Sequence, residues 1–239
     1  MCFECQKNGL NRRNLLKCAG LGASALALSP RLAFAAESKS ELTPDEALAK
    51  LKQGNEKFVN DAEACAAHLA QRRGELVKGQ APWATILTCS DSRVTPELVF
   101  GGVSLGELFV VRNAGNVLET VGLGTLEYGA EHLHAPLIVV MGHKKCGAVS
   151  AACDVAKNGT VLDGSIGKMV EPIIPVALSN IKAGGDFIDK TVHANAVHGA
   201  ARVIAESPII AHLVDAGKVQ VVPAYYDLDS GHVDFLHMG

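Results

Sequence analysis

This sequence has few aromatic side chains and no large excess of charge of either sign. Of its 239 residues only 5% are aromatic, and 22 Lys and Arg residues stand against 25 Asp and Glu, for a formal net charge of −3. No basic stripe with interleaved aromatic residues appears, so nothing indicates a nucleic-acid partner. Internal repeats, low-complexity tracts and a linker to a second domain are also absent. With 48% hydrophobic residues and 24 Gly, the sequence predicts a compact, soluble α/β domain.

A hydrophobic run long enough to span a bilayer is missing near the N-terminus. The apolar run at 18–28 has 11 residues, whereas a transmembrane helix needs about 20. The pair Arg12-Arg13 precedes this run, and Ala33-Phe34-Ala35 follows it as a small-x-small cleavage site. This order of regions is typical of a secretory signal, and the arginine pair is typical of a twin-arginine leader. The other interpretation is a frayed amphipathic N-terminus with two accidental arginines.

Removal of the leader, residues 1–35, leaves an acidic domain of residues 36–239. It carries 17 basic and 24 acidic residues, because the leader takes five basic residues and one acidic residue. We expect this domain in the periplasm or outside the cell, without stable membrane insertion after removal of the signal. It keeps four cysteines, too few to indicate a disulfide framework. Of these, Cys65 and Cys153 are interpreted as buried apolar residues.

The rest of the chain alternates between helix and strand patterns. Thr43-Pro44-Asp45-Glu46 is a capping box with Pro in the first turn, which predicts an amphipathic helix. Four runs of apolar or β-branched residues are typical of strands buried on both faces. These runs are 84–88, 108–111, 137–141 and 219–222. Further helices are predicted over 62–78, 120–133, 148–157, 168–182 and 191–205, and a hairpin over 226–233. The alternation predicts an α/β fold: a central, mainly parallel β-sheet flanked by helices, with an N-terminal helical arm.

Three polar segments follow predicted strands. They are CSDSRV at 89–94, RNAGN at 112–116 and GHKKCG at 142–147. Ligands of open α/β sheets bind outside the carboxyl ends of the strands, so these segments are expected to meet there. Cys89, His143 and Cys146 supply two thiolates and an imidazole, which suit zinc and leave a fourth tetrahedral position free. By spacing alone, a His-x-x-Cys pair is more often a chance occurrence, because free Cys is usually a small buried hydrophobic residue.

In this order and spacing, CSDSRV, RNAGN and GHxxCGA resemble the motifs of the β-class carbonic anhydrases with a plant-type active site. The segment YYDLDSGHV at 225–233 is similar to that family's closing hairpin, and the resemblance runs from about Glu41 to the C-terminus. It implies a zinc ion held by Cys89, His143 and Cys146. It also implies reversible hydration of CO2 to bicarbonate and a proton by zinc-bound hydroxide, and assembly as a homodimer or homotetramer.

The resemblance assigns Asp91 and Arg93 to a catalytic pair, and the chemistry of the residues agrees. Two thiolates cancel the charge of the metal, which makes it a weaker Lewis acid than a zinc held by three imidazoles. Asp91 can accept a hydrogen bond from the hydroxide and aim its lone pair at carbon, provided that it stays ionised. Arg93 can hold Asp91 away from the metal through a forked pair of hydrogen bonds. Without the neighbouring Cys89, the pair would be interpreted as a surface ion pair in a turn.

Other positions carry over by resemblance to a substrate pocket. Gln80, nine residues before Cys89, matches a glutamine that donates to the substrate oxygen. Phe109 and Tyr128 match aromatic lining positions, and Gly147 matches a backbone donor. In a dimer some of these residues would come from the partner chain. Core packing for the two aromatic residues and a helix-terminal role for Gln80 are the alternatives, although apolar CO2 needs a largely hydrophobic pocket with one or two donors.

Two single residues carry further expectations. His132, four residues after Tyr128 on the same predicted helical face, is the candidate for proton transfer, although a lone histidine is more often exposed or packed. Ile86 stands where some bacterial members of the family have a Trp that belongs to a noncatalytic bicarbonate pocket. We therefore expect an open site at neutral pH, without inhibition by bicarbonate.

Two other functions fit the same ligands. A hydrolase of carbonyl sulfide or carbon disulfide would keep the zinc site and change the substrate. A noncatalytic zinc-binding or redox protein would keep the ligands alone. Asp91 and Arg93 count against the second alternative, because a structural zinc site needs neither a base nor a free fourth position.

Overall fold

The computed structural model describes residues 40–61, 73 and 76–238. All of these residues lie in one compact unit. The predicted leader, Cys65 and most of the predicted helix over 62–78 lie outside the described residues. At the end of that predicted helix, Leu76–Lys78 form a 3-10 turn (η2), which closes with a hydrogen bond from the Gly79 N–H to the Leu76 carbonyl.

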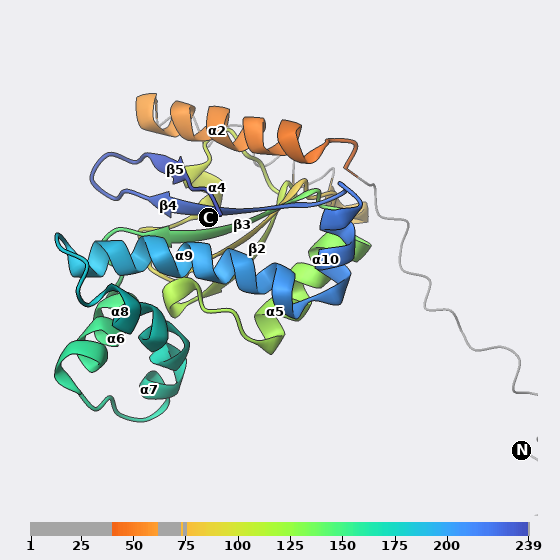
Figure 1. Cartoon of the computed structure of the whole chain (residues 1–239). Coiled ribbons are helices and arrows are strands. Elements are labelled where there is room, and N and C mark those ends of the chain that lie inside the picture. Colours follow the sequence, from red (N-terminus) through yellow and green to blue (C-terminus); the bar gives the residue numbers. More distant parts are fainter. Residues whose placement is uncertain (1–39, 62–72, 74–75, 239) are drawn as a thin grey trace, which may run out of the picture. The chain divides into compact units, whose positions relative to one another are not determined.

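A five-stranded sheet lies at the centre of the protein (Figure 1). Its strands are β1 (Ala84–Cys89), β2 (Leu108–Asn113), β3 (Leu137–His143), β4 (Gln220–Tyr226) and β5 (Val233–Phe235). Strands β1 to β4 are parallel, and β5 pairs antiparallel with β4 as the predicted hairpin. The predicted fold class is confirmed. Each of the four parallel strands continues past its predicted end, so that Cys89, Arg112 and His143 are strand residues.

The strand order β2-β1-β3-β4-β5 creates a switch point between β1 and β3. From β1 the chain crosses to β2 on one side, and from β2 it crosses back to β3 on the other side. Where two neighbouring strands send their connections in opposite directions, an opening remains outside their carboxyl ends. Cys89 is the last residue of β1 and His143 is the last residue of β3, so the fold places them on either side of this opening.

Helix α2 (Pro44–Asn60) covers one face of the sheet. Its N-terminus has the predicted capping box: the Thr43 hydroxyl accepts from the Glu46 N–H at 3.3 Å, and the Glu46 carboxylate accepts from the Thr43 N–H at 2.8 Å. Ala47 and Leu51 are fully buried and pack with Ile86 of β1 in an apolar cluster. Since burial of apolar surface is the main favourable term in folding, this stripe fixes α2 on the sheet.

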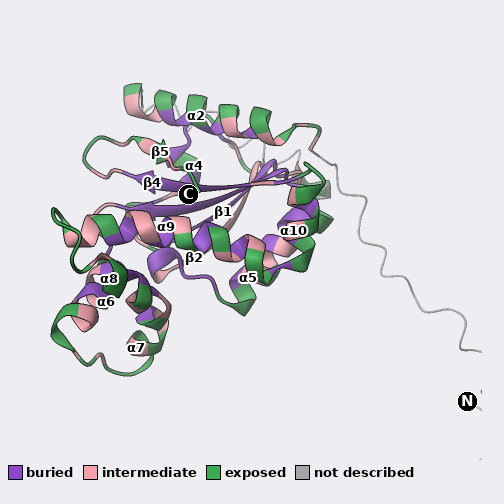
Figure 2. Ribbon diagram, in the orientation of Figure 1, coloured by how far each residue is buried: buried purple, intermediate pink, exposed green. Residues whose placement is uncertain are grey.

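The opposite face is covered by three helices, α5 (Thr120–Glu127), α9 (Phe187–Glu206) and α10 (Pro208–Asp215). Leu126, Val203 and Ile210 from these helices pack against Leu87 and Val140 of the sheet. Figure 2 shows the strands buried between the two helical layers, with the exposed residues on the outer sides of the helices. Among the described residues, no helix is both long and apolar enough to cross a membrane.

The remaining elements are shorter. They are α4 (Pro96–Val99), η3 (Ala114–Asn116), η4 (Tyr128–His132), α6 (Gly147–Asn158), α7 (Ser165–Val170), η5 (Glu171–Ile173) and α8 (Ile174–Asn180). Helices α6, α7 and α8 group beside the sheet, below α9 in Figure 1. They enclose a third apolar cluster that also contains Cys89, Cys146 and Cys153, so Cys153 is buried as expected.

Two predicted helices are interrupted. The helix predicted over 168–182 is wrong as a single element, because Pro172 and Pro175 interrupt it; proline lacks the N–H that an interior turn requires. The helix predicted over 120–133 changes to a π-helical turn, η4, after Glu127. In this turn Gly129 approaches β1 so closely that a Cβ atom would lie 2.6 Å from the Thr85 hydroxyl oxygen.

Candidate metal centre

Cys89, His143 and Cys146 lie together at the switch point between β1 and β3. Cys89 and His143 end their strands, and Cys146 immediately precedes helix α6 as its N-cap residue. The two sulfur atoms are 3.9 Å apart, and the three potential ligand atoms all lie within 4.8 Å of one another. All three side chains are buried. The structure thus brings together the three residues in which the sequence predicts a metal site.

The imidazole of His143 is oriented by its own loop. Nδ1 lies 2.9 Å from the Lys144 carbonyl, so Nδ1 carries the proton and donates it to that oxygen. Nε2 is fully buried and has no hydrogen-bond partner. A buried polar atom without a partner is costly, and a metal ion is the partner that a deprotonated imidazole nitrogen accepts. A backbone acceptor for the other ring nitrogen is the usual support of a ligating histidine.

The contact between the two sulfur atoms shifts their pKa values in opposite directions. A hydrogen bond from the Cys146 S–H lowers the pKa of Cys89 far below its ordinary value, although burial opposes this shift. The same contact raises the pKa of Cys146, since a second thiolate would face the first at close range. A divalent cation removes this conflict, because both sulfurs can then be thiolates.

The donor set fits zinc. With Zn–S bonds of about 2.3 Å and tetrahedral angles, two sulfur ligands are about 3.8 Å apart, close to the separation seen between Cys89 and Cys146. Two sulfurs and one imidazole nitrogen make three protein ligands. Catalytic zinc sites have three protein ligands, whereas structural sites have four.

Asp91 and Arg93 form a bidentate ion pair at the edge of this centre. Arg93 donates from Nε to Asp91 Oδ1 at 2.9 Å and from Nη2 to Oδ2 at 2.7 Å, and the Arg93 backbone N–H donates to Oδ1 at 3.0 Å. These bonds hold the pKa of Asp91 well below its usual range. The carboxylate is therefore ionised throughout the neutral range and turned toward the guanidinium. Its Oδ2 atom is still only 3.9 Å from Nε2 of His143.

Comparison with known proteins agrees with this geometry. The family model described as "Carbonic anhydrase" matches residues 84–233, which include all three motif-bearing strands and the closing hairpin segment 225–233. The chain belongs to the carbonic anhydrase family. It is 37% identical over 188 residues to a protein named carbonic anhydrase 2 of Mycobacterium tuberculosis, an alignment that covers 79% of this chain and 90% of that protein.

Solved structures of β-carbonic anhydrases have the same fold. A Coccomyxa β-carbonic anhydrase, solved in complex with acetazolamide, is 28% identical, with a TM-score of 0.61 over 79% of this chain and 86% of the other. One of the tetrameric β-carbonic anhydrases of Sordaria macrospora is 21% identical, with a TM-score of 0.62 over 77% and 93%. The second likeness shows the fold alone.

The RNAGN motif of this carbonic anhydrase supports the first ligand and the loop after it. Arg112 donates from Nε to the Cys89 carbonyl at 3.1 Å and from Nη2 to the Asp91 carbonyl at 2.7 Å. The Gly115 N–H donates to the Cys89 sulfur at 3.3 Å. The sequence indicates the motif but not the roles of these residues, because each role is a contact with β1 or with the loop that follows it.

Gly115 could have been recognised only from its backbone. Its φ is +78°, and a Cβ atom there would lie 2.7 Å from Cδ1 of Ile173. Its carbonyl accepts a hydrogen bond at 3.0 Å from the buried side chain of Asn195, on α9. A larger residue would move the N–H away from the Cys89 sulfur.

The predicted pocket residues lie elsewhere on the same chain. Phe109 and Tyr128 have ring centroids 6.0 Å apart, and the Tyr128 and His132 rings are 5.1 Å apart. Phe109 pairs with Thr85, four residues before Cys89 on β1, which is about 13 Å along a strand. These aromatic rings therefore belong to the end of the sheet opposite the metal centre.

Gln80 and Gly147 also lie at opposite ends of the sheet from each other. Gln80 precedes β1 and lines a surface hollow with Leu105 and Gly106. Gly147 follows Cys146 directly as the first residue of α6, with open space where a Cβ atom would be. Only Gly147, of the four predicted pocket residues, is beside the metal centre of its own chain.

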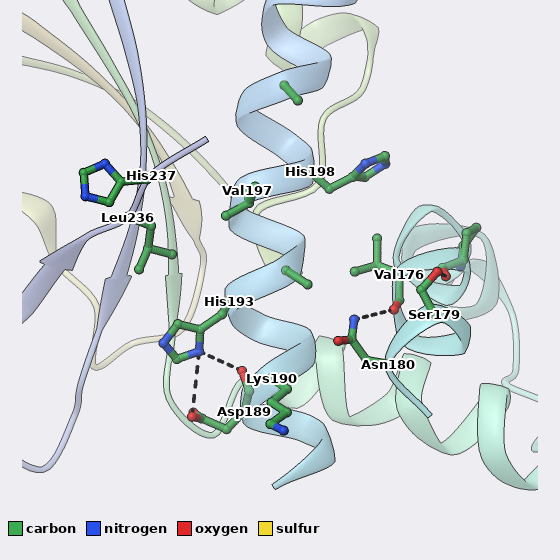
Figure 3. A pocket seen from close by; sticks show the side chains of 13 residues that line it. Val176, Ser179, Asn180, Asp189, Lys190, His193, Val197, His198, Leu236 and His237 are labelled. Carbon is green, nitrogen blue, oxygen red and sulfur yellow. Dashed lines mark hydrogen bonds and ion pairs between the residues drawn. The ribbon is translucent and has the colours of Figure 1, made fainter. Parts of the chain in front are cut away.

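A separate hollow of about 970 Å³ lies along α9, between α8 and the C-terminal segment. Figure 3 shows His193, Val197 and His198 of α9 in this hollow, with Leu236 on one side and Asn180 on the other. None of the predicted site residues lines it.

X-ray absorption at the zinc edge tests the ligand set and the open site together. For the zinc-loaded protein at pH 7.5 we expect two sulfur ligands, one nitrogen and one oxygen from solvent, because Arg93 holds Asp91 and the Ile86 side chain lies in the apolar core. Asp91→Asn is expected to give the same first shell. A shell that changes with this substitution would place Asp91 on the metal.

Cys153 supplies the matched control. It is a third buried cysteine in the same apolar cluster and is not among the grouped ligands. Cys153→Ser is expected to keep zinc and the wild-type spectrum, whereas Cys146→Ser is expected to lose zinc on gel filtration. Equal zinc content in the two variants would contradict the ligand assignment.

Proposed function

We propose that this chain is an exported, zinc-dependent carbonic anhydrase that interconverts CO2 and bicarbonate, with a site that two copies of the chain complete. One observation carries the reaction: a buried Cys–His–Cys cluster with an unpartnered imidazole nitrogen lies beside an ionised aspartate that an arginine holds. When bound, zinc supplies the Lewis acid that lets water ionise near neutral pH. The other steps fall to the residues of the chain.

Asp91 orients the nucleophile in this proposal. As a carboxylate it is an acceptor only, so it can accept a hydrogen bond from the O–H of a hydroxide and has no proton to donate to the lone pairs of that oxygen. This fixes which face of the oxygen points to carbon. Arg93 keeps the carboxylate ionised and directed, and Arg112 fixes the backbone that carries it. A misplacement of about 1 Å at a reacting group can lower the rate by about a hundredfold.

Asp91→Asn is expected to lower kcat/KM for CO2 hydration by about a hundredfold with zinc content unchanged, because an amide can donate as well as accept. Stopped-flow measurement with a pH indicator gives the rate. The control is Asp163→Asn, an exposed carboxylate in the loop before α7, which is expected to leave the rate unchanged.

A hydrogen sulfide release assay, run beside CO2 hydration, separates the competing functions. A zinc-loaded protein that releases hydrogen sulfide from carbonyl sulfide or carbon disulfide, and leaves CO2 untouched, would reassign the substrate. A zinc-loaded protein with no turnover of either substrate would make the site noncatalytic.

A second copy of the chain is proposed to supply Gln80, Phe109 and Tyr128 to each metal centre. Within one chain these residues are far from the metal ligands along β1. Strand β2 is the edge of the sheet, and its apolar residues from Leu108 to Val111 are only partly buried. An apolar sheet edge is a ready-made contact for another chain, and a two-fold dimer would bring opposite ends of the two sheets together. A tetramer of such dimers has the same two-chain sites.

Subunit complementation tests this arrangement. Asp91→Asn spoils the metal half of a site and Gln80→Ala spoils the proposed partner half. After unfolding and refolding of an equal mixture, half of the dimers are mixed, and each mixed dimer has one intact site if the site spans two chains. We expect about a quarter of the wild-type activity, above the level of either variant alone. No gain on mixing would confine each site to one chain.

The proposed export rests on the N-terminal sequence. Replacement of Arg12 and Arg13 by Lys is expected to keep the full-length chain in the cytoplasm of a bacterial host that has the twin-arginine pathway. Arg31→Lys, downstream of the apolar run, is the matched control and is expected to be exported and cleaved near Ala35. Cell fractionation and the mass of the recovered chain give the result. Equal export of both variants would contradict a twin-arginine leader.

A further inference from the structure

The loop between the metal ligands His143 and Cys146 contains two lysines with different surroundings. Lys144 is partly buried, and its Nζ lies 3.0 Å from Asp227 Oδ2 and 3.0 Å from Asp229 Oδ2. The Lys145 side chain is mostly exposed, and its Nζ has one longer contact, 3.5 Å, with Asp229. The two lysines have the same charge and adjacent positions, but only Lys144 is anchored on two carboxylates.

The backbone of Lys144 is fixed as well. Its N–H donates to the Tyr226 carbonyl at 2.9 Å, which continues the pairing of β3 with β4 by one residue. Its carbonyl is the acceptor for Nδ1 of His143 at 2.9 Å. The carbonyl that orients the imidazole therefore belongs to a residue held at its N–H and at its ammonium group.

The conformation after Lys144 explains why an anchor is needed. Lys145 has φ of +56°, in the left-handed region that residues with a side chain rarely adopt. This conformation turns the chain so that Cys146 comes back toward His143. Such a conformation persists only where neighbouring contacts hold the chain on both sides. Helix α6 holds it on the Cys146 side, and Lys144 holds it on the other.

Asp227 and Asp229, which contact Lys144, lie in a turn that the Asp227 side chain stabilises. Asp227 uses Oδ1 to accept from the backbone N–H groups of Asp229 and Ser230, at 2.7 and 3.3 Å, and leaves Oδ2 for Lys144. This turn joins β4 to β5. The hairpin is in turn attached to α2.

The attachment to α2 is made by Asn55, which is buried. Its Nδ2 donates to the Gly231 carbonyl at 2.8 Å, and its Oδ1 accepts from the Val233 N–H at 2.8 Å. A continuous set of hydrogen bonds therefore runs from α2 through the hairpin to the loop that carries two metal ligands.

We propose that Lys144 is a positioning residue for the metal centre: its contacts with Asp227 and Asp229 hold the Lys144 carbonyl where it orients the His143 imidazole. The proposal rests on the assignment of Cys89, His143 and Cys146 as zinc ligands. Contacts in this outer layer typically change metal affinity by 10- to 100-fold. Loss of the anchor is therefore expected to show in how long zinc stays bound.

The test compares zinc release from Lys144→Met and Lys145→Met, using the zinc-loaded protein and a chromogenic chelator in excess at pH 7.5. Lys144→Met is expected to release zinc about tenfold faster than wild type, whereas Lys145→Met, which removes the same charge next to it, is expected to change the rate less than twofold. Lys144→Arg can still bridge two carboxylates and is expected to restore slow release.

A double-mutant cycle with Asp227→Asn assigns the effect to the contact. If Lys144 acts through Asp227, Lys144→Met in the Asp227→Asn background adds little to the rate. The absorption spectrum of the cobalt-substituted variants should keep its thiolate bands, since the ligands themselves are unchanged. Should Lys144→Met not fold, Asp227→Asn against Lys145→Met decides the question in the same way.

The proposal would be overturned if Lys144→Met released zinc at the wild-type rate. It would also be overturned if Lys144→Met and Lys145→Met released zinc equally fast. Release of zinc is measured without CO2, so the two ideas fail separately. If zinc release depends on Lys144 as expected but the zinc-loaded protein does not hydrate CO2, the proposed function is refuted and this inference stands.

Discussion

The sulfur atoms of Cys89 and Cys146 lie 3.9 Å apart although 57 residues separate them in the chain. Without a cation, a second thiolate at this distance would face the first, so the Cys146 thiol keeps its proton and its pKa is raised. Strand β1 and the Gly115 N–H hold the first sulfur, and helix α6 holds the second. The order of the strands brings these elements together, and a divalent cation would then let both sulfurs be thiolates.

A second constraint concerns the carboxylate beside the ligands. Asp91 Oδ2 lies 3.9 Å from Nε2 of His143, within reach of a metal at the centre, and 2.7 Å from Nη2 of Arg93. The same oxygen can serve one partner at a time. With three ligands from the protein, an Asp91 held by Arg93 leaves a coordination position for solvent, whereas an Asp91 on the metal would fill it. The Arg93 side chain is half exposed, so a group that binds its guanidinium from outside would compete with Asp91 for the same N–H groups.

The distribution of residues along β1 explains why this enzyme is proposed to work in pairs. The metal ligands are at the carboxyl end of the sheet, and Gln80, Phe109 and Tyr128 are at the other end. A single chain thus has its metal ligands at one end of the sheet and the predicted pocket residues Gln80, Phe109 and Tyr128 at the other. The partly buried β2 edge, with the exposed Val121 eight residues after its end, offers the surface on which a second copy would join them.

The sequence by itself determined the strands, the start of α2 and the kind of chemistry, whereas the helices predicted over 120–133 and 168–182 are interrupted in the structure. Runs of apolar residues are long enough only for strands, the capping box at Thr43 fixes where α2 begins, and two cysteines with a histidine limit the metal to one that accepts sulfur and nitrogen. These features depend on neighbouring residues and on side-chain chemistry, so they can be recognised without a fold.

The tertiary structure decided everything that depends on pairs distant in sequence. That β1 lies between β2 and β3, that Arg112 reaches the Cys89 carbonyl, and that Lys144 meets the β4–β5 turn are all consequences of strand order. The π-helical turn η4 lies where Gly129 closely approaches Thr85 of β1. Periodicity and spacing describe one segment at a time, whereas each of these contacts is selected by the packing of two segments at once.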